Sequence, residues 1–119
     1  PKNILLQDIL VALGTKDLER GLVALEKATS SHVDVKLLYK LLLERIRSVI
    51  LVRHNPKSIE SLAEQYGDAE KDLITTYAKE STSPINSHLL LKTLEMGSYI
   101  GKSALPVLPL ELLLLEHCK

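Results

Sequence analysis

The sequence Ser103-Ala-Leu-Pro-Val-Leu-Pro-Leu-Glu-Leu-Leu-Leu-Leu-Glu-His-Cys-Lys119 decides the fold of this chain. Pro109 lacks a backbone N–H and has φ fixed near about −65°, so it predicts that a helix begins there. Leu110 and residues 112–115 then make this helix apolar around almost its whole circumference. Because such a helix has no polar face for water, we expect it to be covered on several sides. The cover is either the rest of its own domain or a second subunit.

The composition favours a single all-helical domain. A chain of 119 residues is long enough for one domain with one core. Apolar residues make up 45% and aromatic residues only 3%, whereas strands favour β-branched and aromatic side chains. The formal net charge is zero, so no overall field attracts nucleic acid or an anionic membrane.

The two ends of the chain and its cysteine content predict a cellular setting. The chain begins with Pro1 rather than Met, and we expect residues 1–119 to be a single domain cut from a longer multidomain protein. No signal-peptide pattern opens it, and no apolar run approaches the ~20 residues that span a bilayer. Cys118 is the only cysteine and has no partner for an internal disulfide, which favours a reducing compartment, the cytoplasm.

Apolar spacing and helix-ending residues predict a compact bundle of about six or seven helices. Gly14 is expected to end the first helix and Thr15 to cap the second. Asp34 is expected to cap the longest helix, which Asn55-Pro56 ends, because the residue before proline avoids the helical region. The helices are predicted at residues 4–13, 15–30, 35–53, 58–67, 68–80, 85–101 and 109–119. In the sixth helix, the side chains expected to be buried are Leu89, Leu90, Leu94 and Ile100.

The sequence offers no pattern that predicts catalysis, a cofactor site or a metal site. It contains neither G-x-x-x-x-G-K-[ST] nor G-x-G-x-x-G, the loops that present backbone N–H groups to phosphates. Its histidines are scattered, and His117 and Cys118 point to different sides of one helix. His117 therefore cannot activate Cys118 as a nucleophile. Glu60, Glu64 and Glu70 are interpreted as a solvated face.

A set of six basic residues, on the long helix and just after it, is a candidate ion-pair network or a candidate anion-binding patch. Lys40 and Arg47 are seven residues apart on the long helix, and Glu44 lies between them, which favours a local ion-pair network. The alternative is a helical domain that binds nucleic acid, with an affinity that falls steeply with salt, or binds a peptide. The set comprises Lys40, Arg45, Arg47, Arg53, His54 and Lys57.

The C-terminal block resembles the end of the third domain of the bacterial DNA polymerase III gamma/tau subunit. That domain typically closes with Ser-Pro-x-Pro-x-Leu-x-Leu-Glu-Leu, and this chain has Ala104 where the pattern has its first proline. The start of the chain agrees as well, since Gly14-Thr-Lys-Asp17 opens a helix and Arg47 precedes an aliphatic run. The positions that match the terminal pattern are Ser103, Pro106, Leu108, Leu110, Glu111 and Leu112.

The resemblance implies an assembly role in bacterial DNA replication. In that family, ATPase modules precede this domain, and the third domains pack side by side into the collar of the clamp loader. It implies an all-α, collar-like oligomerisation domain that is not itself an enzyme, inside an ATP-dependent holoenzyme. Its partners would be other clamp-loader subunits, both like and unlike, with no strong nucleic-acid binding and no membrane. The structural or interface motif would comprise Pro106, Leu108, Pro109, Leu110, Glu111 and Leu112.

Overall fold

The described part of the chain is all-helical. The computed structural model describes residues 2–62 and 64–119, and these contain seven α-helices, one short 3-10 helix and no strand. None of the described helices is long and apolar enough to cross a membrane. The helices are α1 (Lys2–Thr15), α2 (Leu18–Ser30), α3 (Val35–His54), α4 (Ser58–Leu62), α5 (Asp68–Lys79), α6 (Ser87–Met96), η1 (Gly97–Tyr99) and α7 (Leu108–His117).

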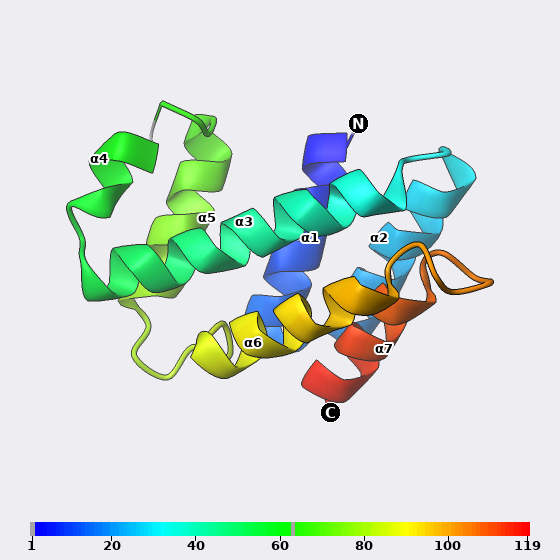
Figure 1. Cartoon of the computed structure of the whole chain (residues 1–119). Coiled ribbons are helices and arrows are strands. Elements are labelled where there is room, and N and C mark those ends of the chain that lie inside the picture. The colour runs from blue at the N-terminus through cyan, green and yellow to red at the C-terminus, as the bar shows by residue number, and fades with distance from the viewer. Residues whose placement is uncertain (1, 63) are drawn as a thin grey trace.

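The long helix α3 runs across the molecule and organises the others around it (Figure 1). It contacts α1, α5 and α6, while α1 and α2 pack against each other. Helices α4 and α5 lie at one end of the molecule, and α2 and α7 lie towards the other (Figure 1). The molecule measures 41 × 27 × 25 Å, and its core is formed mainly by leucine side chains from α1, α2, α3 and α7.

Several predicted helix ends are confirmed. The Asp34 side chain accepts a hydrogen bond from the backbone N–H of Lys36 (2.9 Å) and so caps α3. Helix α3 ends at His54, before Asn55-Pro56, as predicted. Pro109 lies in the first turn of α7, where its missing N–H costs no hydrogen bond.

The predicted junction between the first two helices is wrong. Gly14 lies inside α1, and the residue in the left-handed region is Lys16, with φ of 56°. The cap of α2 is Asp17 rather than Thr15, and its carboxylate accepts from the N–H of Arg20. Gly14 has a packing role instead, because a Cβ there would lie 2.4 Å from Cε1 of Tyr77.

Two further helices are shorter than their sequence patterns predicted. Helix α4 spans only Ser58–Leu62. The helix predicted at residues 85–101 begins at Ser87 and tightens into η1 at Gly97, where the Tyr39 hydroxyl occupies the space a Cβ would need. In α6, Leu89 is buried as predicted, whereas Leu94 is 57% exposed and lies outside the core.

Candidate functional site

Helix α7 divides its leucines between two sides. Leu110, Leu113 and Leu114 are at most 2% exposed and join the core. Leu112 and Leu115 are 49% and 45% exposed. With the half-buried Leu108, they follow the i, i+4, i+7 spacing that places side chains on one side of a helix. We call Leu108, Leu112 and Leu115 the outer stripe of α7. The rest of the single chain covers α7 on the side of Leu110, Leu113 and Leu114 and leaves the outer stripe uncovered.

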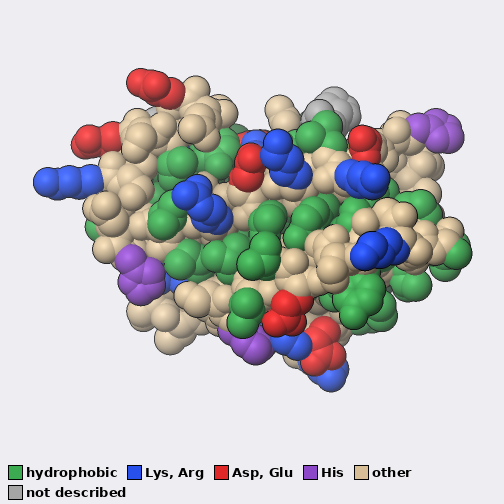
Figure 2. Space-filling model, in the orientation of Figure 1, with side chains coloured by type: hydrophobic (Ala, Val, Ile, Leu, Met, Phe, Trp, Pro, Cys, Tyr) green, Lys and Arg blue, Asp and Glu red, His purple; other side chains and the backbone are tan. Residues whose placement is uncertain are grey.

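The outer stripe borders an apolar groove between η1 and α7. The groove has a volume of about 280 Å³ and is lined almost entirely by apolar surface. Leu105, in the loop between η1 and α7, is 60% exposed, and Figure 2 shows hydrophobic side chains exposed around this loop. The lining comprises Met96, Tyr99, Ser103, Leu108, Pro109 and Leu112.

The terminal motif shapes this groove through local contacts. Ser103 accepts a hydrogen bond from the N–H of Leu105 (3.2 Å), which turns the loop, while Pro106 is exposed at its end. Pro109 is largely buried and lines the groove. Glu111 is half-buried in the first turn of α7, where a carboxylate suits the positive end of the helix dipole. Among the described residues Glu111 makes no ion pair, so its carboxylate is solvated at the edge of the stripe.

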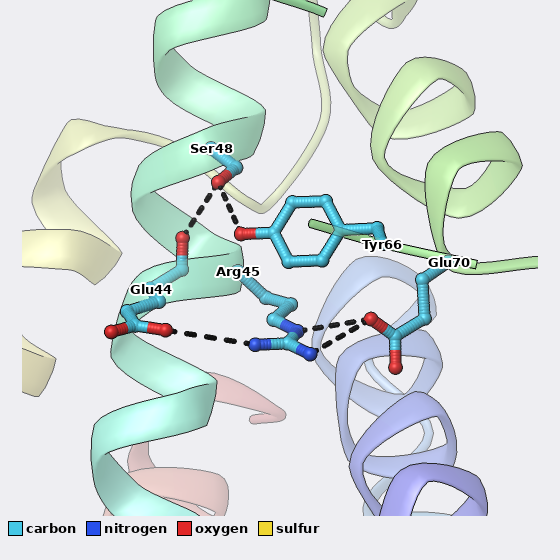
Figure 3. Close-up of polar contacts among 5 residues, drawn as sticks. All are labelled: Glu44, Arg45, Ser48, Tyr66 and Glu70. Atoms are coloured by element: carbon cyan, nitrogen blue, oxygen red, sulfur yellow. Dashed lines mark hydrogen bonds and ion pairs between the residues drawn. The ribbon is translucent and has the colours of Figure 1, made fainter. Parts of the chain in front are cut away.

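The structure does not bring the basic set together as one surface. Arg45 is buried and donates from Nε and a terminal nitrogen to Oε2 of Glu70, at 3.2 and 2.9 Å. Its guanidinium lies 4.6 Å from the centre of the Tyr66 ring, and Glu44 approaches it at 3.7 Å (Figure 3). Glu70 was expected on a solvated face but is 6% exposed, because Arg45 compensates its charge.

The remaining members of the set have separate environments. Arg53 is half-buried and donates to the carbonyl oxygens of Tyr77 (2.9 Å) and Ala78 (3.2 Å). Lys40, Arg47, His54 and Lys57 are exposed. Two of the three arginines are therefore engaged within the fold, which leaves a sparse row of cations for an external anion.

His117 and Cys118 anchor the end of α7 to α1. Nε2 of His117 lies 2.8 Å from the carbonyl oxygen of Leu13, so this nitrogen carries the proton. Burial lowers the pKa of His117, the hydrogen bond to the Leu13 carbonyl opposes this shift, and Lys16 and His88 lower the pKa slightly further. Burial raises the pKa of the Cys118 thiol, which donates to the Ala12 carbonyl at 3.8 Å. This thiol is in its protonated form near neutral pH, the unreactive form of cysteine.

Sequence reasoning missed the groove and the buried Arg45–Glu70 pair. The position of Arg45 in the sequence could have predicted the pair. It lies on the same side of α3 as the core residues Leu38, Leu42 and Val49. No group of three metal-ligating side chains occurs in the part of the chain that the structure describes. Comparison with known protein families, curated proteins and solved structures finds no match for this chain.

Proposed function

We propose that this chain is an assembly module, the collar domain of a bacterial clamp-loader subunit of the gamma/tau type. The observation that carries the assembly role is the outer stripe of α7, which stays about half exposed although the helix has no polar side. The terminal motif supports the more specific clamp-loader identity. In this proposal the chain performs no reaction and joins its subunit to like and unlike neighbours.

The composition of the surface around the groove supports an interface. The cores of protein interfaces are depleted in charged side chains and enriched in Tyr and Met. Tyr99, at 62% exposed, and Met96 flank the stripe, and no charged side chain lines the groove among the described residues. Covering a half-exposed leucine contributes roughly 1 kcal/mol.

The roughly 1 kcal/mol gained by covering each leucine also predicts the strength of assembly. Association costs several kcal/mol in lost translational and rotational freedom, so Leu112 and Leu115 alone cannot hold two subunits together. Leu105 and Tyr99 must be covered as well. We therefore expect weak, reversible association of the isolated chain, which other domains of a longer protein would strengthen through effective concentration.

Sedimentation equilibrium over a wide concentration range tests this proposal. The Leu112→Glu/Leu115→Glu double variant should abolish self-association and keep its helical circular dichroism, because both positions are exposed. Leu51→Glu is the matched control, since Leu51 is an exposed leucine (38%) on α3, away from the groove. A wild-type chain that stays monomeric at high concentration, or a loss of association equally large in the control, would contradict self-assembly through this surface.

The same samples test the nucleic-acid alternative. The assembly proposal predicts no binding of short duplex DNA at moderate salt. Binding that falls steeply with salt and is lost in Lys40→Gln/Arg47→Gln would instead support the exposed members of the basic set as a phosphate-contacting surface.

A further inference from the structure

A second groove lies at the end of the molecule formed by α4, α5 and the last turns of α3 (Figure 1). Its volume is about 480 Å³, within the range of small-molecule sites in proteins. Most of its surface is apolar, and two cations complete it. The apolar residues that line it include Val52, Pro56, Ile59 and Ala78, and the cations are Arg53 and Lys79.

Arg53 is held in place by the carbonyl groups at the end of α5. Two of its N–H groups donate to the oxygens of Tyr77 and Ala78, which fixes the plane of the guanidinium. A guanidinium carries five N–H donors, so three remain. Nη1 makes no hydrogen bond within the described residues and is not buried, so its two N–H groups reach solvent.

No acidic side chain compensates the positive charge of this groove within the described residues, and the carbonyl groups at the end of α5 offset only part of it. Neither Arg53 nor Lys79 makes an ion pair there, and no carboxylate side chain lines the groove. A ligand that fits must therefore offer apolar surface to Val52 and Ile59 and negative charge to the two cations. The two oxygens of a carboxylate match the planar fork of an arginine.

We propose that this groove binds a medium-chain carboxylic acid. Its carboxylate contacts the free N–H groups of Arg53 and the ammonium of Lys79, and its alkyl chain lies along Val52, Ile59 and Ala78. The proposal is independent of the assembly role, because it uses no residue of the outer stripe of α7.

Three probes with one alkyl chain and different head groups test the proposal on the whole chain. Octanoate, octanol and octylammonium are titrated separately, and binding is followed by calorimetry and by the methyl NMR signals of Val52, Ile59 and Ala78. Octanoate should bind more tightly than octanol, and octylammonium should bind least. Hexanoate should bind roughly tenfold more weakly than octanoate, because two methylenes leave the apolar wall.

Substitutions of the two cations test where the carboxylate of octanoate binds. Lys79→Gln, at an exposed position, should weaken octanoate about threefold to fivefold and leave octanol unchanged. Lys40→Gln is the charge-matched control on α3 and should change neither. Arg53→Met should weaken octanoate further, with its folding checked by circular dichroism because it also frees two carbonyl groups. Equal affinity for octanoate and octanol, methyl shifts outside the groove, or equal effects of Lys79→Gln and Lys40→Gln would overturn the proposal.

Discussion

The buried ion pair between Arg45 and Glu70 ties α3 to α5. Both side chains are at most 10% exposed, and the pair is completed by the Tyr66 ring under the guanidinium. The Ser48 hydroxyl donates its proton to the Glu44 carbonyl (2.9 Å), so the Tyr66 hydroxyl is the donor to Ser48 (2.9 Å). Tyr66, which precedes α5, is thereby held against α3 (Figure 3).

Removing one partner of this pair should destabilise the fold far more than removing both. Arg45→Met leaves the buried Glu70 carboxylate without a cation and should lower the free energy of unfolding by about 3 kcal/mol. The double variant Arg45→Met/Glu70→Leu removes the uncompensated charge and should recover most of that loss. Urea denaturation measures both values.

The control for this comparison is Arg47→Met, an equivalent substitution at an exposed position on the same helix. We expect it to change the free energy of unfolding by less than about 0.5 kcal/mol. A double variant as unstable as Arg45→Met would show that the hydrogen-bonded pair itself, rather than the orphaned carboxylate, supplies the stability.

At the scale of elements, Gly14 lets α1 pack closely against Tyr77 of α5. In helices, alanine is more favourable than glycine by about 1 kcal/mol, so propensity alone predicts that Gly14→Ala stabilises α1. Its Cβ would instead lie 2.4 Å from the ring of Tyr77, which is only 6% exposed and is enclosed by its neighbours. We expect a net loss of about 1–2 kcal/mol in the free energy of unfolding.

Gly67→Ala is the matched control for Gly14→Ala. A Cβ at Gly67 would meet nothing within 4 Å, and the residue has φ of −69°, which alanine adopts freely. Because Gly67 is the N-cap of α5, a position that favours glycine over alanine, its thermal unfolding should match that of the unsubstituted chain or occur slightly lower. If Gly14→Ala were stabilising, Tyr77 would have to repack, and the glycine would then have no packing role in α1.

These elements show how far the sequence determines the fold. Caps such as Asp34 and the proline of α7 act within one turn, so local pattern predicts them correctly. Gly14 has the same local signal as a helix-ending glycine, but its neighbour is Tyr77, which is far away in sequence. Contacts of that kind depend on the tertiary arrangement, and no local pattern contains them.

At the scale of the whole molecule, the sequence predicted the all-helical class but not the exposed side of α7. The spacing of apolar residues identifies a buried face only when polar residues mark the opposite one. In α7 the leucines at 112–115 surround the axis, so the exposed side is decided by where α2 and α6 contact it. The groove beside Arg53 was equally beyond prediction, because α3, α4 and α5 together form it.

His117 joins the end of α7 to α1 through the Leu13 carbonyl, and the burial of its imidazole should make stability depend on pH. Burial lowers the pKa of His117 in the folded chain below its ordinary value of 6.5. The unfolded chain then binds a proton more readily than the folded one, so the stability from this residue is present above pH 6.5 and is lost as pH falls below it. Urea unfolding between pH 7.5 and pH 5.5 measures this loss.

The His117→Gln variant tests the cause. Its amide can still donate to the Leu13 carbonyl, and the loss of stability in acid should shrink. The control His32→Gln, at an exposed position, should retain the loss. An unchanged pH dependence in His117→Gln would show that other groups, not the buried imidazole, destabilise the fold in acid.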